Sequence, residues 1–497
     1  MDTPRFADLA QEKLVHPILL TTIVDDLKFD HMMPVQAATL HDLLREKVDC
    51  LAQAKTGTGK TIAFLLPAIQ NMVITPRTKK SISLLVLSPT RELAMQIAKE
   101  AEKLLQRMPN YKVRTAIGGT NKIAEASSIL QGCDILVATP GRLLDHLSDE
   151  EMRLRLVNLK TLVLDEADRM LDMGFLPDIR KILGFLPDKR RIPRQSMLFS
   201  ATLEGQIQDV AHLILNEGHK FISTITPGEA GTHERVPQRL VVVPTMTDLA
   251  PALVASVKVE CINPSDFKAI IFAPTAALAD FYGQILRAQK GLPPTSILHS
   301  RISQTKRTRI TQEFREAPSA ICVATDVIAR GMDFPNVSHV FQIGLPADKA
   351  SYVHRLGRTA RADANGRGIL LLAKPEQAFL HQLKDVTFQS SEPLVYSKAD
   401  IDPLLSRVEN KEKVYQSWLG YYKSSTKLLG WSPAELVRQA NIFALEGLGC
   451  SEIPALEKKT IGKMGLKGVS GLVVKPNAPG SNDDRARGGG EGRRTGR

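Results

Sequence analysis

One stretch of eight residues limits what this chain can fold into more than any other. Residues 54–61 read A-K-T-G-T-G-K-T and match the phosphate-loop pattern G-x-x-x-x-G-K-[ST] except at Ala54, which replaces the first glycine. Gly57 and Gly59 allow the backbone N–H groups to form one concave nest at a helix N-terminus, which binds anions. The alternative, a glycine-rich turn without a ligand, is disfavoured by so full a match. The stretch predicts a nucleoside triphosphate site in an α/β domain.

The side chains in and near this loop suggest separate roles around a triphosphate. Lys60 is placed to reach the terminal phosphates, and the Thr61 hydroxyl is placed to hold a magnesium ion. Upstream, Gln36 follows Pro34 at a predicted helix start. A glutamine amide carries both a donor and an acceptor, so it can pair with the edge of adenine. We therefore expect Gln36 to read the base.

Apolar stretches of strand length recur through the first half of the chain, each followed by polar residues and a helical stretch. They are Cys50–Ala52 before the phosphate loop, Ser83–Leu87 before S-P-T-R-E-L-A, Asp134–Ala138 before T-P-G-R, Lys160–Leu164 before D-E-A-D, and Ser196–Phe199 before S-A-T. This alternation predicts a parallel sheet with its site at the carboxyl ends of the strands.

The acidic run D-E-A-D stands where such a strand would end. We expect Asp165 to hold the metal and Glu166 to polarise the attacking water. Taken alone, an acidic run at this place is more often a helix cap. Its position about a hundred residues after the phosphate loop favours the catalytic interpretation.

The second half repeats the alternation without a phosphate loop of its own. Residues 223–238 collect Pro, Gly and charge, which predicts a linker, and a second α/β stretch begins at Arg239. Its expected strands include Ala269–Phe272, Ala320–Ala324 and Val337–Ile343.

Three arginines near the end of this second stretch recur at every third residue. Arg355, Arg358 and Arg361 would share one face of a helical turn. A solvated basic face is the plain alternative. If they face a γ-phosphate across a cleft, they stabilise charge in the transition state, and hydrolysis would require the two lobes to close.

Taken together, these motifs resemble those of the DEAD-box RNA helicases over roughly residues 6–375. The matching positions are Phe6, Phe29, Gln36, the phosphate loop, P-T-R-E-L-A (89–94), Gly118-Gly119, T-P-G-R (139–142), D-E-A-D (165–168), S-A-T (200–202), Q-x-x-R (Gln304, Arg307), A-T-D-V-I-A-R-G-M-D (324–333) and H-R-L-G-R-T-A-R (354–361). Their order and spacing are specific as a set. Two positions depart from the family pattern, because Lys28 and Ala360 stand where it usually or often has Gly.

The resemblance implies two tandem RecA-like α/β domains with parallel sheets, ATP and Mg²⁺ as cofactors, and RNA contacts through phosphate and 2′-hydroxyl groups without sequence preference. The implied catalytic residues are Glu166, Lys60, Arg358 and Arg361. The implied nucleotide-binding residues are Phe29, Gln36, Ala54, Lys55, Thr56, Gly57, Thr58, Gly59, Lys60, Thr61 and Asp333, and the implied metal-binding residues are Thr61 and Asp165. The implied RNA-binding residues are Pro89, Thr90, Arg91, Gly119, Thr139, Arg142, Arg307, Thr325 and Asp326. Residues implied to couple hydrolysis to unwinding are Ser200, Thr202 and His354.

The expected organisation is a first lobe over residues 1–222, a linker over 223–238, a second lobe over 239–395, a helical extension over 396–474 and a disordered basic tail over 475–497. From residue 458 onward the chain has ten Lys or Arg against three Asp or Glu, more than half of its formal net charge of +12. Such a tail can tether structured RNA, or it can be merely solubilising. Tyr415, Trp418 and Tyr422 in the extension are expected in a core, with an RNA-facing platform as the alternative.

A helical extension followed by a Gly/Arg-rich tail resembles the fungal mitochondrial DEAD-box proteins that act as general RNA chaperones in group I and group II intron splicing. That resemblance implies the mitochondrial matrix and a monomer. The N-terminus M-D-T-P-R-F shows no transit or signal segment, so cytosol or nucleus is the alternative unless a presequence has been removed. Five scattered cysteines predict a reducing compartment, and no apolar run approaches the length of a membrane span.

Two other functions stay open. One is a non-catalytic, ATP-gated RNA clamp that nucleates a ribonucleoprotein complex, which the presence of Glu166, Arg358 and Arg361 disfavours. The other is a DNA translocase, which Gln36 and the full motif set disfavour. The expected activity is RNA-stimulated ATP hydrolysis coupled to local separation of RNA strands.

Overall fold

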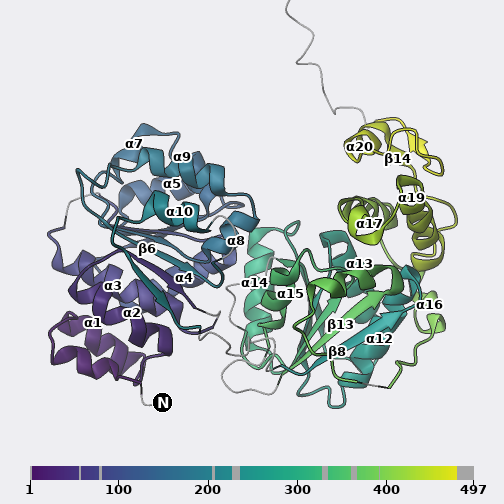
Figure 1. Cartoon of the computed structure of the whole chain (residues 1–497), viewed down its shortest axis with the longest axis horizontal. Coiled ribbons are helices and arrows are strands. Elements are labelled where there is room, and N and C mark those ends of the chain that lie inside the picture. The colour runs from purple at the N-terminus through teal and green to yellow at the C-terminus, as the bar shows by residue number, and fades with distance from the viewer. Residues whose placement is uncertain are drawn as a thin grey trace, which may run out of the picture.

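The computed structural model places two α/β lobes side by side, with an additional C-terminal unit on the second lobe (Figure 1). It describes residues 3–54, 57–77, 81–203, 207–225, 236–326, 334–359, 366–390 and 392–477. The predicted site residues Lys55, Thr56, Asp333 and Arg361 lie outside these ranges, as does Ala360. Among the described residues, no helix is both long and apolar enough to cross a membrane.

The described part of the first lobe is built on seven parallel strands in the order β3-β4-β2-β5-β6-β1-β7. Consecutive residues of one strand point to opposite faces, so Leu84 and Val86 join one hydrophobic core while Leu85 and Leu87 join another. The strands are β1 (Cys50–Gln53), β2 (Leu84–Leu87), β3 (Val113–Ala116), β4 (Ile135–Ala138), β5 (Thr161–Leu164), β6 (Gln195–Ser200) and β7 (Lys220–Ser223).

Helices cover both faces of this sheet, which is why its central strands are buried throughout. The helices are α1 (Pro17–Thr21), α2 (Pro34–Arg45), α3 (Lys60–Ile74), α4 (Arg91–Leu104), α5 (Lys122–Gln131), α6 (Pro140–His146), α7 (Glu150–Leu154), α8 (Ala167–Asp172), α9 (Leu176–Phe185) and α10 (Ile207–Ile214).

The strand order decides where the motifs lie. Because the strands are parallel, the motifs that follow them meet along one edge of the sheet. Gly118-Gly119 follows β3, T-P-G-R follows β4 and P-T-R-E-L-A follows β2, so these three motifs occupy one end of that edge. The phosphate loop follows β1 near the other end, with D-E-A-D after β5 and S-A-T after β6 between them.

The second lobe repeats this plan with six parallel strands among its described residues, in the order β10-β11-β9-β12-β13-β8. Figure 1 shows α14 on the side that faces the first lobe. The strands are β8 (Gln238–Val243), β9 (Lys268–Phe272), β10 (Thr295–Leu298), β11 (Ala320–Ala324), β12 (His339–Ile343) and β13 (Arg367–Ala373). The main helices are α12 (Leu249–Glu260), α13 (Ala276–Arg287), α14 (Gln304–Glu316) and α15 (Lys349–Leu356).

The C-terminal extension packs into the core of the second lobe rather than forming a core of its own. Trp418 stacks on Phe443 with ring centroids 5.3 Å apart, and Phe443 meets Phe281 of α13 at 6.2 Å. Tyr415, Trp418 and Tyr422 are buried, so the expectation that they are core residues is confirmed. Its elements are α16 (Asp402–Leu405), α17 (Lys411–Ser424), α18 (Thr426–Leu429), α19 (Pro433–Ile442), β14 (Leu456–Glu457), α20 (Lys458–Lys463) and β15 (Val474–Lys475).

Three expectations about boundaries need correction. β7 reaches Ser223 and β8 starts at Gln238, so both ends of the expected linker 223–238 belong to the sheets. The extension is not wholly helical, because β14 and β15 form a small parallel sheet. Residues 475–477, assigned to the disordered tail, are folded: Lys475 lies in β15 and pairs with Glu412, and the Asn477 side chain accepts from Lys459 N at 3.0 Å. Residues 478–497 lie outside the described ranges.

Candidate active site between the two lobes

The acidic residues after β5 are buried at the edge of the sheet. Asp165 and Glu166 are 3% and 4% exposed, and the Asp165 carboxylate accepts a hydrogen bond from Glu166 N at 3.0 Å. Glu166 has φ 50° and ψ 52°, a left-handed conformation that costs a non-glycine residue about 1–2 kcal/mol. Burial raises the pKa of Asp165 to about 7, against the opposing effect of the Lys60 charge. A bound cation would offset this burial, so the site suits a metal ion held by oxygen ligands.

The phosphate loop runs from the buried Ala54 into α3, with Gly57 and Gly59 at φ 78° and 85°. Lys60 is the first residue of α3, and its Nζ donates to the carbonyl of Ala54 at 3.0 Å. Thr61 follows it in the first helical turn, half-buried. The structure therefore brings the predicted phosphate-binding lysine and the predicted metal-binding hydroxyl to one helix start.

The side chain of Gln36 is fixed against this loop. Its Oε1 accepts from Met33 N at 2.8 Å and its Nε2 donates to Gly59 O at 3.0 Å. Gly59 must be glycine here, because a Cβ at this position would lie 2.4 Å from Gln36 Nε2 and the backbone has positive φ. The ring of Phe29 lies half-buried 6.3 Å from Phe6, on the same N-terminal segment.

The S-A-T segment touches both the phosphate loop and D-E-A-D. Ser200 O accepts from Ala54 N at 3.0 Å, and Ser200 Oγ donates to Thr202 O at 2.6 Å. Thr202 Oγ1 in turn donates to the Asp168 carboxylate at 3.4 Å. Ser200 and Thr202 thus form a physical connection between the two halves of the predicted hydrolytic centre.

A cavity of about 700 Å³ lies between the lobes and gathers the predicted RNA-binding residues. Gly119 alone among them is absent from its lining, and it lies behind Arg91, whose Nη1 would be 2.3 Å from a Cβ there. The predicted residues on its wall are Pro89, Thr90, Arg91, Thr139, Arg142, Arg307, Thr325 and Asp326. Sequence reasoning missed Glu92, Gly118, Gly141, Asp145, Arg169, Met173, Phe175 and Ser300. The available signal was position along the chain: Glu92, Gly118 and Gly141 lie inside quoted motifs, and Arg169, Met173 and Phe175 lie in the stretch after D-E-A-D.

The lobes are joined at this cavity by a buried ion pair. Arg307 Nη2 of the second lobe lies 2.5 Å from the Glu92 carboxylate of the first, and both side chains are almost fully buried. Gln304 Nε2 donates to Glu92 at 3.1 Å. In this structure Arg307, predicted to contact RNA, also holds the lobes together.

Arg355 and Arg358 do not share one helical face, so the expectation was wrong for this pair. α15 ends at Leu356, so Arg355 lies on the helix and Arg358 lies buried in the turn beyond it. The Arg355 guanidinium forms a two-pronged ion pair with Asp326 at 2.7 and 2.9 Å. Arg355 is therefore a structural partner of a cavity residue rather than a solvated charge. His354 is buried on the same helix.

Two parallel-sheet lobes, with a phosphate loop in the first and a shared cavity between them, define a helicase-type ATPase core. The DEAD/DEAH box helicase profile matches residues 33–210, and the helicase conserved C-terminal domain profile matches residues 253–363.

Relatives extend the match to almost the whole chain. The mitochondrial ATP-dependent RNA helicase MSS116 of Phaeosphaeria nodorum is 46% identical over 475 residues, which cover 91% of this chain and 84% of that protein. DEAD-box ATP-dependent RNA helicase 26 of Oryza sativa subsp. japonica is 44% identical over 466 residues, covering 92% and 84%. The solved structure of Mss116p (NTE and C-tail double deletion) bound to ssRNA and AMP-PNP matches with a TM-score of 0.85 and 31% identity, covering 96% of this chain and 97% of that one. The chain belongs to the DEAD-box ATP-dependent RNA helicases.

Proposed function

We propose that this protein binds ATP and single-stranded RNA, couples RNA-stimulated ATP hydrolysis to local separation of RNA duplexes, and serves mitochondrial intron splicing as a monomeric RNA chaperone. The observation that carries the proposal is the order of motifs along the first sheet. The cavity lies at the β3, β4 and β2 end, the phosphate loop follows β1, and S-A-T touches both the loop and D-E-A-D. Such coupling requires an RNA site and a nucleotide site within one unit, and the two proposed sites lie along the same edge of the first sheet.

Gln36 would select adenine. An amide oxygen can accept twice and an amide nitrogen can donate twice. Met33 N and Gly59 O use one of each, which fixes the orientation of the amide. One acceptor and one donor remain, and they match the N6 and N7 edge of adenine. Phe29, with the remaining loop residues, would complete the nucleotide site.

Asp165 and Thr61 would hold Mg²⁺, since a carboxylate and a hydroxyl are the hard oxygen ligands that this ion takes. A bound Mg²⁺ neutralises charge on the phosphates. Lys60 would exchange its bond to Ala54 O for the terminal phosphates, and Glu166 would orient and polarise the attacking water. Arg358 and Arg361, in the second lobe, would stabilise charge in the transition state once RNA and ATP close the lobes, and Asp333 would lie beside the ribose.

RNA would lie in the cavity between the lobes, held by its backbone. Arg91, Arg142 and Arg307 contribute guanidinium groups to its wall, and such groups pair with phosphate oxygens, which carry no sequence information. This favours sequence-nonspecific binding. The mitochondrial assignment rests on the names of relatives such as MSS116, and localisation of the tagged full-length protein would test it.

The decisive test is phosphate release from ATP with and without single-stranded RNA. We expect RNA to stimulate release by the unmodified protein, and Glu166→Gln to slow it at least about a hundredfold while ATP-dependent RNA binding is retained. As a matched control, Glu100→Gln removes a half-buried carboxylate that pairs with Lys103 in α4. Near-normal release by Glu166→Gln would remove Glu166 from the reaction. Release that RNA does not stimulate in the unmodified protein would favour the non-catalytic clamp.

A further inference from the structure

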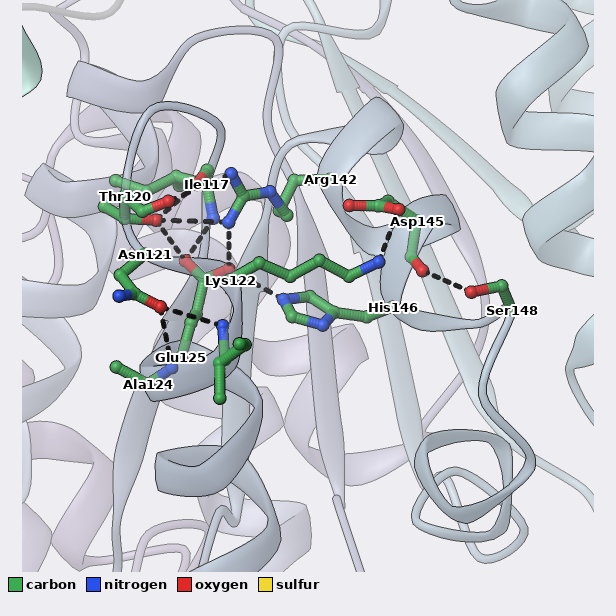
Figure 2. Close-up of polar contacts among 11 residues, drawn as sticks. Ile117, Thr120, Asn121, Lys122, Ala124, Glu125, Arg142, Asp145, His146 and Ser148 are labelled. Atoms are coloured by element: carbon green, nitrogen blue, oxygen red, sulfur yellow. Dashed lines mark hydrogen bonds and ion pairs between the residues drawn. The ribbon is translucent and has the colours of Figure 1, made fainter.

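A buried carboxylate outside the motifs stands behind the wall of the cavity. Glu125 lies in the first turn of α5 (Figure 2). Its side chain is 8% exposed. Its Oε1 accepts from Ile117 N at 2.9 Å and from Thr120 Oγ1 at 3.0 Å. Its Oε2 accepts from Arg142 Nη1 at 2.8 Å and from His146 Nε2 at 2.7 Å. One side chain therefore makes four hydrogen bonds.

These bonds join two motifs that the sequence separates. Ile117 directly precedes Gly118-Gly119, and Arg142 ends T-P-G-R. Burial on its own would raise the pKa of Glu125, but the hydrogen bonds from His146, Ile117 N and Arg142 outweigh it and hold the pKa below its usual range. The carboxylate is thus an ionised, acceptor-only hub between the two motifs.

The hub fixes the plane of the Arg142 guanidinium. Nη1 donates to Glu125 and to Thr120 Oγ1, and Nη2 donates to Thr120 O at 3.3 Å. Within the described ranges, Nε–H and the second Nη2–H of Arg142 make no hydrogen bond. Because the guanidinium is planar and rigid, holding three donors aims the remaining two. Arg142 lines the cavity, so these donors are available to a ligand there.

The surroundings keep this frame rigid. His146 is 2% exposed and lies one turn after Arg142 on α6, so it holds Glu125 from the same helix. On the exposed side, Lys122 Nζ pairs with Asp145 at 2.6 Å and fastens α5 to α6 (Figure 2). Asn121 Oδ1 caps the start of α5 by accepting from Ile123 N and Ala124 N.

We infer that Glu125 is a positioning residue for RNA binding: it orients Arg142 and the Gly118-Gly119 loop toward the RNA backbone. This inference rests on the proposed function, which assigns Arg142 to RNA. Glu125 itself does not line the cavity. It also lies at the β3–β4 end of the sheet, away from the phosphate loop after β1. Its loss should weaken RNA binding and leave hydrolysis at saturating RNA unchanged.

The test measures RNA-stimulated phosphate release against the concentration of a single-stranded oligouridylate in four proteins: unmodified, Glu125→Gln, Arg142→Ala and the double variant. Glutamine keeps the shape of Glu125 but turns one acceptor toward Arg142 into a donor. We expect Glu125→Gln to raise the half-saturating RNA concentration about tenfold, with kcat and the KM for ATP unchanged. In the Arg142→Ala background, Glu125→Gln should raise the half-saturating RNA concentration by less than about twofold further.

The outcomes separate the two ideas. If Arg142→Ala leaves the half-saturating RNA concentration unchanged, Arg142 does not bind RNA and that part of the proposed function fails. If Arg142→Ala weakens RNA binding but Glu125→Gln does not, the positioning role is wrong. If Glu125→Gln weakens RNA binding equally with and without Arg142, the positioning role is also wrong.

A second variant covers the case in which Glu125→Gln proves unstable. Glu125→Asp keeps the charge but is one methylene too short to hold Ile117 N and Arg142 together, so it should weaken RNA binding in the same way. Glu100→Gln is the control for loss of a carboxylate.

Discussion

Gln36 illustrates how a single side chain can determine which base a nucleotide site accepts. Its amide is buried and cannot flip without losing its bonds to Met33 N and Gly59 O. Guanine presents an acceptor where adenine presents its N6 donor, so the remaining groups of the amide would face mismatched partners. We expect RNA-stimulated hydrolysis to favour ATP over GTP by at least about tenfold, and Gln36→Ala to narrow that ratio. The ratio is measured by RNA-stimulated hydrolysis of ATP and GTP in competition. Equal use of the two nucleotides by the unmodified protein would exclude Gln36 from base selection.

The backbone conformation of Lys28 costs folding free energy. It stands where the family usually has Gly, and its backbone has φ 57°, which glycine adopts without strain. Lys28→Gly should therefore stabilise the first lobe by about 1 kcal/mol, visible as a higher midpoint of its thermal transition. Lys99→Gly, within α4, is the control and should destabilise by about the same amount. A lower midpoint for Lys28→Gly would show that the lysine side chain contributes more than the strain costs.

At the scale of single residues, the sequence predicted groups that lie close together along the chain and missed groups that lie far apart. The phosphate loop and D-E-A-D were predictable because each is a short pattern after an apolar strand. The Glu125 hub was not, since its partners lie eight, seventeen and twenty-one residues away and Glu125 belongs to no motif. The pairing of Glu92 with Arg307 crosses 215 residues and two lobes. Only the tertiary fold brings such groups together.

At the scale of elements, the junction between the extension and the second lobe contains a buried acid. Glu376 is fully buried in a 3-10 helix (Lys374–Gln382) after β13. It accepts from the hydroxyl of Tyr422 on α17 at 2.7 Å, from Leu345 N at 3.1 Å and from Ala373 N at 2.8 Å. Burial raises its pKa to about 7 in spite of these hydrogen bonds.

This junction should make the stability of the second lobe depend on pH. The pKa of Glu376 is higher in the folded chain than the 4.5 of a free glutamate, so folding favours the protonated form. That contribution is present below pH 4.5 and is lost as pH rises toward 7. We expect the free energy of unfolding of this unit to fall by about 3 kcal/mol from this group between pH 4.5 and 8, and Glu376→Gln to remove that part of the slope. Denaturant unfolding at several pH values measures the difference, and parallel slopes for the two proteins would contradict it.

In the extension and in α15, the spacing of residues alone did not predict their structural role. Helical spacing of Tyr415, Trp418 and Tyr422 suits a core and an RNA-facing platform equally, and only their burial decides for the core. The expected shared face failed for Arg355 and Arg358 for a local reason. Gly357 follows Leu356 and ends α15 before Arg358, a stop signal that the repeat of three obscured. Strands β3, β7, β8, β10 and β13 were not singled out. Of these, only β3 is followed directly by a motif, and Gly118-Gly119 is too short to mark the end of a strand.

At the scale of the whole molecule, the basic residues of the C-terminus can be removed without touching the described structure. Deleting residues 478–497 removes five arginines but no described contact. We expect hydrolysis at saturating short RNA to stay within about twofold, while binding to a large folded RNA weakens. Each lost phosphate contact should reduce the log–log salt dependence by roughly 0.7–0.9. A salt series on a folded RNA measures this, and an unchanged slope and affinity would show the segment to be only solubilising.

Deletion from residue 396 should do more harm, because it uncovers the second lobe. Tyr421 donates to Leu345 O at 2.6 Å, and Trp418, Tyr422 and Leu436 are buried in the core shared with that lobe. Their loss would leave apolar surface exposed, so we expect aggregation or a lower thermal midpoint. A soluble, equally stable residue 1–395 fragment would contradict the shared core.

That shared core has a consequence for the order of events at the ribosome. The first sheet is complete once Ser223 has been made, so the first lobe can fold while synthesis continues. The second core spans Val236 to Leu466, so it stays unfinished until nearly the whole chain has emerged. During that interval Phe281 lacks Phe443, its partner from the extension. Until the extension is made, the nascent second lobe exposes apolar surface, so we expect chaperones to bind that lobe rather than the first.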